Sequence, residues 1–308
     1  MTTNQHTIFS TSDYVYLAEA VLKHPGFEKG EAELKRFPDG ESYHRILTPV
    51  EGKSVVLIGG SFNDAAMMEM YDMACGLVQQ GAAALTMVIP YFSYSTMERT
   101  VKSGEIVKAK TRAVLFSSVP RTSFGNRILL FDLHTEGLPY YFHSDIRPQH
   151  IYCKPVIMEA AREIFGNDFV LASTDAGRAK WVESLANDMQ VHAAFVYKRR
   201  IDGTETKLTG ISADVKGKNV IIYDDMIRTG GSLIQAGKAY KEAGAEKIAV
   251  IATHGIFPGD GLKRLRDSGL FHTVICTDTH PSAVAQKDDF LKIKSIGTLI
   301  AENLREKI

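Results

Sequence analysis

Two adjacent carboxylates and a loop rich in glycine and hydroxyl groups lie in the stretch 219–232, NVIIYDDMIRTGGS. The carboxylates are Asp224 and Asp225, and the loop after them consists of Arg228, Thr229, Gly230, Gly231 and Ser232. Glycines let a backbone turn tightly and point successive N–H groups at an anion, and hydroxyls add further donors. A helix that starts after such a loop directs its positive end at the same point. The stretch therefore predicts a sugar phosphate site, with phosphate at the loop and sugar hydroxyls at the aspartates.

This loop is distinct from a Walker loop, because the stretch contains no Gly-Lys-Ser or Gly-Lys-Thr. The alternative that the residues leave open is an ordinary strand, turn and capped helix without a ligand. Adjacent aspartates followed by Thr-Gly-Gly-Ser favour the phosphate site over that alternative.

Three further polar signatures follow apolar runs that are typical of buried strands. They are Asp132-Leu133-His134, Thr174–Gly177 and Thr253–Gly255. Ligands of open α/β sheets bind at the carboxyl ends of strands, so these residues border either one cleft or two facing rims. His134 and Asp175 are suitable metal ligands, and Mg²⁺ prefers carboxylates, water and phosphate oxygens. An isolated Asp-Leu-His is more often a structural histidine, so both interpretations of His134 stay open.

The main basic cluster is Lys198-Arg199-Arg200, in a polar segment that also contains Asp-Gly. Considered alone, this cluster indicates an exposed hairpin tip. Beside a phosphate loop, Lys198 and Arg200 become candidates for neutralising the charge that develops during phosphoryl or diphosphoryl transfer. Closure of such a loop would also exclude water and protect the donor from hydrolysis.

Alternating strand and helix patterns must position these residues. Continuous apolar runs at 54–58 and 220–223 predict strands buried on both faces, and the stretches 63–80 and 155–165 predict helices. The alternation predicts an α/β protein with mainly parallel sheets flanked by helices. A length of 308 residues accommodates two domains, with a boundary near residue 150.

Composition excludes several classes of protein. Lys plus Arg and Asp plus Glu both total 36, which argues against nucleic-acid binding through bulk charge. The three cysteines, Cys75, Cys153 and Cys276, lack metal-binding spacing and indicate a reduced, cytoplasmic protein. The amino terminus lacks the pattern of a signal peptide, and no apolar run approaches the roughly 20 residues of a membrane span.

Taken together, these motifs resemble the ribose-phosphate diphosphokinases, or phosphoribosyl pyrophosphate synthetases. The resemblance runs almost end to end and rests on residues 35–41, 63–64, 89–92, 132–134, 175–177, 198–200, 224–232, 253–255 and 277–279. The Asp-Asp and Thr-Gly-Gly loop is shared with phosphoribosyltransferases at large. The order of Phe-Pro-Asp-Gly-Glu, Asp-Leu-His and Lys-Arg-Arg is more specific to the synthetases.

The resemblance implies two phosphoribosyltransferase-like domains at 1–150 and 151–296, with a terminal helix at 297–308 that returns to the first. The implied enzyme transfers the β,γ-diphosphoryl group of ATP to the anomeric hydroxyl of ribose 5-phosphate. Its products would be phosphoribosyl diphosphate and AMP, it would require Mg²⁺, and it would serve nucleotide biosynthesis. It would also be a homo-oligomer.

The resemblance also assigns roles to individual residues. Catalysis is assigned to Lys198 and Arg200, and the metal to His134 and Asp175. The ribose phosphate is assigned to Asp224, Asp225, Arg228, Thr229, Gly230, Gly231 and Ser232. The nucleotide is assigned to Phe37, Asp39, Glu41, Arg99 and His134, with the adenine contacts made from a neighbouring subunit.

Two departures separate the chain from the common class I members. Thr96-Met97-Glu98-Arg99 stands where class I has Arg-Gln-Asp-Arg, and Arg228 stands where class I has aspartate. The first departure resembles the class II enzymes known from plants, which are less dependent on phosphate and less selective for the nucleotide donor. The departures leave open a larger acceptor such as ADP-ribose, or a catalytically silent regulatory homologue. A base phosphoribosyltransferase is disfavoured by the amino-terminal segment that contains residues 37–41.

Overall fold

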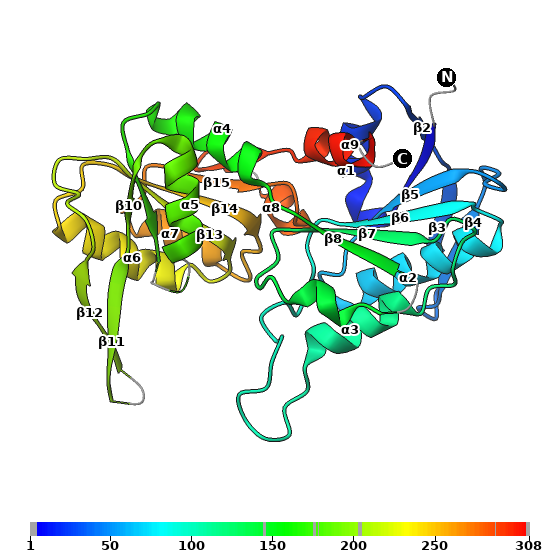
Figure 1. Cartoon of the computed structure of the whole chain (residues 1–308), viewed down its shortest axis with the longest axis horizontal. Coiled ribbons are helices and arrows are strands. Elements are labelled where there is room, and N and C mark those ends of the chain that lie inside the picture. The colour runs from blue at the N-terminus through cyan, green and yellow to red at the C-terminus, as the bar shows by residue number, and fades with distance from the viewer. Residues whose placement is uncertain are drawn as a thin grey trace. The chain divides into compact units, whose positions relative to one another are not determined.

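The computed structural model describes residues 5–143, 146–174, 177, 179–202, 205–286 and 288–305. Contacts group the chain into two compact units: unit 1 consists of Met1–Tyr152 and Ser295–Ile308, and unit 2 of Cys153–Lys294. Each unit contains one six-stranded sheet and one separate two-stranded hairpin (Figure 1). The prediction of an α/β protein with mainly parallel sheets flanked by helices is confirmed.

The sheet of unit 1 has the order β2-β1-β5-β6-β7-β8, and every neighbouring pair is parallel. Its strands are β1 (His6–Ser10), β2 (Phe27–Lys29), β5 (Ser54–Ile58), β6 (Ala84–Ile89), β7 (Asn126–Phe131) and β8 (Ile146–Ile151). The helices are η1 (Ser12–Tyr14), α1 (Val15–Leu22), α2 (Asp64–Gln79), α3 (Lys108–Ser117), η2 (Leu138–Tyr141) and α9 (Gly297–Arg305). The antiparallel hairpin of β3 (Ala32–Arg36) and β4 (Ser42–Ile46) lies between β2 and β5 in the chain.

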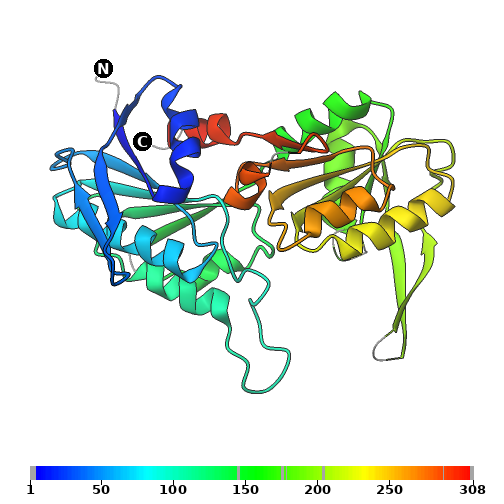
Figure 2. The ribbon, with the colours of Figure 1, turned by 180° about the vertical axis from the view of Figure 1, so that it is seen from behind.

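Helices cover both faces of this sheet, with α2 and α3 on one face and α1 and α9 on the other (Figures 1 and 2). The central strands β5 and β6 are apolar on both faces because both faces are covered. Helix α2 begins where the Asn63 side chain accepts a hydrogen bond of 2.8 Å from the Ala66 amide.

The carboxyl-terminal helix α9 packs against α1 at the start of the chain (Figure 1). Gly297 allows this approach, since a Cβ there would lie 2.7 Å from the Cβ of Ala20. The Arg305 guanidinium donates to the Pro25 carbonyl at 2.6 Å and lies over the ring of Phe27. Unit 1 is therefore built from both ends of the chain.

The sheet of unit 2 has the order β10-β9-β13-β14-β15-β16 and is also parallel throughout. Its strands are β9 (Val170–Ser173), β10 (His192–Ala194), β13 (Val220–Ile227), β14 (Ile248–Gly255), β15 (Val274–Thr277) and β16 (Leu291–Lys294). The helices are α4 (Lys154–Phe165), α5 (Ala179–Met189), α6 (Gly231–Glu242), α7 (Gly261–Asp267) and α8 (Pro281–Ala285). The hairpin of β11 (Val196–Asp202) and β12 (Glu205–Ile211) extends away from this sheet (Figures 1 and 2).

The two sheets share one topology. In each, the second strand lies at an edge, the first lies next to it, and the remaining four follow in chain order. In each, an antiparallel hairpin is inserted between the second strand and the third strand of the sheet. The hairpins β3–β4 and β11–β12 therefore occupy equivalent topological positions, which the sequence patterns did not predict.

The elements differ from the predictions in several ways, since strand β2 and helices α7 and α8 were not predicted. Strand β13 continues to Ile227, so Asp224 and Asp225 belong to the strand instead of following it. Strand β8 was not predicted, because its sequence IRPQHI is largely polar and contains Pro148, as an edge strand tolerates. In the part of the chain that the structure describes, no helix combines the length and apolar character of a membrane span.

Candidate active site

The carboxyl end of β13 holds the two predicted aspartates of unit 2. The Asp224 carboxylate accepts the Asp225 amide at 2.9 Å with one oxygen and the Thr174 hydroxyl at 3.3 Å with the other. Thr174 follows the neighbouring strand β9, so two adjacent strand ends fix this side chain. Asp225 is buried, with 3% of its surface exposed. The structure thus fixes the Asp224 carboxylate, which is suited to accepting hydrogen bonds from sugar hydroxyls, next to the buried Asp225.

The loop between β13 and α6 depends on two glycines, one at its end and one on the helix that packs against it. Gly230 has φ +76°, and a Cβ there would lie 2.8 Å from the Leu265 side chain. A Cβ on Gly261 would lie 2.5 Å from the Arg228 carbonyl oxygen. Helix α7, which contains both Gly261 and Leu265, therefore packs directly against the loop and holds its shape.

The amino end of α6 faces this loop. Gly230 is the N-cap residue, and no described side chain caps the helix. Arg228, Thr229 and Ser232 are exposed. Uncapped amides, a positive helix end and exposed hydroxyl and guanidinium donors together form a suitable cradle for phosphate.

Aromatic residues pack around the strand that carries the aspartates. Trp181 on α5 stacks on Tyr223 with ring centroids 4.3 Å apart, and the Tyr223 hydroxyl lies 3.1 Å from that of Thr253. The Tyr240 hydroxyl of α6 donates to the carbonyls of Ser173 and Ala194 at 3.0 and 3.3 Å. Burial raises the pKa of Tyr240, so the hydroxyl stays a neutral donor. These contacts connect α5 and α6 to the carboxyl edge of the sheet.

The ends of β14 and β15 form a buried network of threonines and histidines. His254 Nδ1 lies 2.8 Å from the Thr279 hydroxyl, and the Thr277 hydroxyl donates to the Thr253 carbonyl at 2.7 Å. His280 Nδ1 accepts the Ser282 amide at 3.1 Å and so caps α8. Burial, and then the charge of His254, lower the pKa of His280 to about 4. This network fixes the strand ends next to the aspartates.

The carboxyl end of β7 in unit 1 carries the Asp-Leu-His sequence. Asp132 has the unusual φ of +35°, and the Leu133 amide donates to His150 Nε2 at 3.0 Å. Burial lowers the pKa of His150, which keeps Nε2 available as an acceptor. His134 follows this fixed turn and is partly exposed, as a ligand-binding residue must be.

The β3–β4 turn presents the residues predicted to bind adenine. Phe37 is 43% exposed and meets Tyr43 edge to face, with centroids 5.9 Å apart. The Phe37 amide donates to the Glu41 carbonyl at 2.8 Å, and the Glu41 amide donates to the Asp39 carboxylate at 3.0 Å. The turn is rigid at its base and displays an aromatic face. Arg99, on the loop after β6, has a side chain that is 80% exposed.

Comparison with known proteins identifies the family. Residues 6–119 match the N-terminal domain of ribose phosphate pyrophosphokinase, and residues 172–308 match the phosphoribosyl synthetase-associated domain. The ribose-phosphate pyrophosphokinase of Chromobacterium violaceum is 32% identical over 303 residues, which are 97% of this chain and 90% of the relative. The chain belongs to the ribose-phosphate pyrophosphokinase family.

Other members of the ribose-phosphate pyrophosphokinase family agree. The ribose-phosphate pyrophosphokinase of a Nostoc species is 33% identical over 96% of this chain and 89% of its own length. Ribose-phosphate pyrophosphokinase 2, chloroplastic, from Spinacia oleracea is 34% identical over 94% of this chain and 72% of its own length. The crystal structure of phosphoribosylpyrophosphate synthetase from Mycobacterium smegmatis superposes with a TM-score of 0.86 at 26% identity, covering 98% of both chains.

The structure does not describe the side chains of three residues that were predicted to belong to the site. Asp175 is not described at all, and Lys198 and Arg200 are described only as backbone of β11, opposite Leu208 and Thr206. The ladder shifts register on both sides of 198–200.

Few protein side chains are needed to hold Mg²⁺ at a nucleotide site. Among the described residues no group of three or more His, Cys, Asp or Glu could hold a metal. Mg²⁺ is commonly held by one or two protein ligands together with water and substrate phosphates. A few separate ligands at strand ends therefore fit a metal that arrives with a nucleotide.

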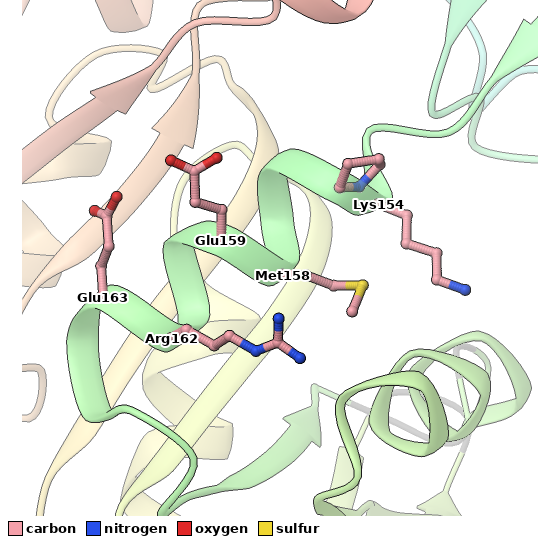
Figure 3. Close-up of a pocket in the computed structure, with 6 residues that line it drawn as sticks. Lys154, Met158, Glu159, Arg162 and Glu163 are labelled. Atoms are coloured by element: carbon pink, nitrogen blue, oxygen red, sulfur yellow. The ribbon is translucent and has the colours of Figure 1, made fainter.

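A hollow on the surface of unit 2 lies elsewhere. It is lined by Lys154, Pro155, Met158, Glu159, Arg162 and Glu163, which all belong to α4 (Figure 3). None of them was predicted as a site residue.

Proposed function

We propose that the chain transfers the β,γ-diphosphoryl group of ATP to the anomeric hydroxyl of ribose 5-phosphate, giving phosphoribosyl diphosphate and AMP. The observation that carries the proposal is the near full-length match to ribose-phosphate pyrophosphokinases, in a chain that retains the β13–α6 cradle. The enzyme is thus a diphosphotransferase that serves nucleotide biosynthesis. Its proposed location is the cytoplasm.

Unit 2 supplies the acceptor half of the reaction. Asp224 and Asp225 accept hydrogen bonds from the ribose hydroxyls, and their fixed geometry orients the sugar. The 5-phosphate binds at the amino end of α6, where the contacting residues are Arg228, Thr229, Gly230, Gly231 and Ser232. Holding the sugar at both ends places the anomeric hydroxyl in one position, which lowers the entropic part of the barrier.

The donor half is drawn from strand and hairpin ends. Adenine stacks on the exposed face of Phe37, with Asp39 and Glu41 as hydrogen-bonding partners, and Arg99 takes the phosphates. The adenine residues act on the site of a neighbouring subunit, so the enzyme is a homo-oligomer. Lys198 and Arg200 stabilise the negative charge that spreads over the transferring oxygens.

Mg²⁺ would be held by His134 and Asp175 together with the nucleotide phosphates. When bound, it neutralises phosphate charge and so makes the transferring group easier to attack. His134 lies after a turn fixed by the Leu133–His150 hydrogen bond. The turn limits where its imidazole can reach.

The test is release of AMP by purified protein. We expect AMP formation that requires ATP, ribose 5-phosphate and Mg²⁺ together, measured by a coupled assay with each component omitted in turn. AMP that forms without ribose 5-phosphate, or no AMP at all, would refute the function. Activity of the purified chain alone would also exclude a silent regulatory homologue, which the retention of His134, Asp175, Lys198 and Arg200 already disfavours.

A larger acceptor is the second candidate, and Arg228 motivates it. Arg228 is exposed beside the phosphate cradle and could pair with a second phosphate of ADP-ribose. Acceptor competition followed by mass spectrometry decides between the two. A kcat/KM that is higher for ribose 5-phosphate than for ADP-ribose excludes the larger acceptor.

A further inference from the structure

Tyr94, five residues after the end of β6, has a backbone that tyrosine rarely adopts. Its φ is +58°, in the left-handed region. A bulky side chain is strained in this conformation, which persists only where surrounding contacts impose it. In this protein, contacts of the Tyr94 side chain with neighbouring helices impose it.

Three charged side chains from two helices hold the Tyr94 side chain. Its hydroxyl donates to Asp64 Oδ1 at 2.9 Å, and Arg112 Nη2 donates to the same oxygen at 2.9 Å. The Arg112 guanidinium lies 5.0 Å from the centre of the tyrosine ring, and Lys108 Nζ lies 4.8 Å from it. The ring is thus held by hydrogen bonding at its edge and by cations at its face.

The position of each partner strengthens these contacts. Asp64 is the first residue of α2, where the helix dipole stabilises a negative charge. The Arg112 side chain on α3 is only 22% exposed, and its Nε has no partner among the described atoms. The Arg112 guanidinium is thus largely desolvated and bonded to a carboxylate, whereas the Asp64 side chain is 63% exposed.

Hydrogen bonds hold the backbone of the residues that follow Tyr94. The Tyr94 carbonyl accepts the Met97 amide at 2.8 Å, and the Met97 carbonyl accepts the Ala109 amide at 3.4 Å. The Tyr141 hydroxyl donates to the Glu98 carbonyl. Arg99 follows directly, with its side chain 80% exposed. The start of the Arg99 side chain therefore follows a backbone anchored at Tyr94, Met97 and Glu98, and its Nε lies 3.4 Å from Glu98 Oε1.

We propose that Tyr94, Asp64 and Arg112 form a latch that positions Arg99 for the phosphates of the nucleotide donor. This inference rests on the proposed function and adds positioning residues to its donor half. None of the three latch residues needs to touch the nucleotide. Without the latch, Tyr94 relaxes to an ordinary φ, the turn at 94–97 opens, and Arg99 spreads over many conformations.

The experiment measures both KM values and kcat by AMP release with Tyr94→Phe in the full-length protein. The variant keeps the ring over Arg112 but loses the hydrogen bond to Asp64. We expect the KM for ATP to rise about tenfold, because a hydrogen bond to a carboxylate is lost. The KM for ribose 5-phosphate should stay within about twofold, since its cradle belongs to unit 2. Tyr71→Phe, which removes an exposed hydroxyl contact to Ser118 in the same unit, is the matched control and should change neither KM.

A second background tests whether the latch acts through Arg99. In Arg99→Ala protein, Tyr94→Phe should raise the KM for ATP by less than about twofold, because the residue that the latch positions is already gone. Asp64→Ala, which removes the acceptor oxygen, should reproduce the effect of Tyr94→Phe, and the double variant should be no worse than either. Calorimetric titration with ATP gives the same comparison without turnover.

Three outcomes would overturn the latch. They are an unchanged KM for ATP in both single variants, equal increases in both KM values, or a full effect of Tyr94→Phe that persists without Arg99. If Tyr94→Phe does not fold, Asp64→Ala and Arg112→Lys provide the same readouts. Failure of the unmodified protein to form AMP refutes the proposed function instead, so the two failures are distinguishable.

Discussion

The hairpins β3–β4 and β11–β12 occupy the same topological position in two sheets of the same order, yet the residues predicted to act in the site differ in kind between them. The first displays an aromatic ring and two carboxylates at Phe37, Asp39 and Glu41. The second carries Lys198 and Arg200. Shared topology therefore provides equivalent places for binding residues and does not determine what they bind.

The carboxyl edges of the two sheets differ in a related way. Unit 2 uses glycine at positive φ in the loop before α6, at Gly230, and holds Phe257 at a φ of +45° just after β14. Unit 1 has Tyr94 and Asp132 at positive φ after β6 and β7 and holds the Tyr94 side chain with a hydrogen bond to Asp64. A phosphate cradle made of amides favours glycine, whereas presenting a distant side chain such as Arg99 or His134 favours residues that can be anchored.

Removal of the Lys198 side chain from the β11–β12 hairpin should have the largest effect, which we expect on kcat. We expect Lys198→Ala to lower kcat by about 1000-fold, since charge stabilisation present mainly in the transition state would be lost. The KM for ribose 5-phosphate should change little. Lys207→Ala, on the partner strand of the same hairpin, is the control for charge alone. A parallel loss of ribose 5-phosphate affinity would show that Lys198 binds substrate instead of the transition state.

The next largest effect should be a loss of folding stability at acidic pH that arises from His280. The native pKa of His280 is about 4 against an ordinary value of 6.5, so the unfolded chain binds the proton first. This contribution to stability is complete above about pH 6.5 and is lost as the pH falls towards 4, by about 3 kcal/mol. His280→Asn retains an N-cap for α8 without titrating and should flatten the loss in chemical unfolding at several pH values. An unchanged slope would mean that other groups control acid stability.

The glycine at the cradle should show an intermediate effect. Gly230→Ala meets Leu265 and adopts a positive φ, so we expect about 2 kcal/mol of lost unfolding free energy and a raised KM for ribose 5-phosphate. Gly259→Ala is the control, because its φ is also positive at +60° but no atom lies within 4 Å of its Cβ. It should cost about 1 kcal/mol and leave KM unchanged. Equal effects of the two variants on the KM for ribose 5-phosphate would show that the loop at Gly230 does not bind this substrate.

The aromatic hairpin should show the smallest effect. We expect Phe37→Ala to raise the KM for ATP about tenfold with little change in the KM for ribose 5-phosphate, because stacking on the adenine is lost. Phe124→Ala, an exposed phenylalanine of the same unit that was not predicted to bind nucleotide, should have no effect. An effect of similar size from Phe124→Ala would indicate a general loss of surface packing.

Local patterns in the sequence predicted the fold class and the cradle for physical reasons. Buried parallel strands need continuous apolar runs, and a phosphate loop needs glycine and hydroxyls, so both leave a signal within a few residues. Contacts between distant residues leave no such signal. The stacking of Trp181 on Tyr223, the packing of Leu265 under Gly230 and the strained φ of Tyr94 all depend on partners far away in the chain. The roles of individual site residues remain predictions for the experiments above.

The position of α9 has a consequence for how the protein is made. Unit 2 is one continuous segment, Cys153–Lys294, whereas unit 1 lacks its last helix until residues 297–305 have been translated. Chains lengthen by roughly 5–20 residues per second and domains fold as units during synthesis. The face of α1 that receives α9 therefore stays uncovered until the end of synthesis, because α9 follows every other helix and strand in the chain. A chain that ended before residue 297 would leave this face of α1 without the helix that packs against it.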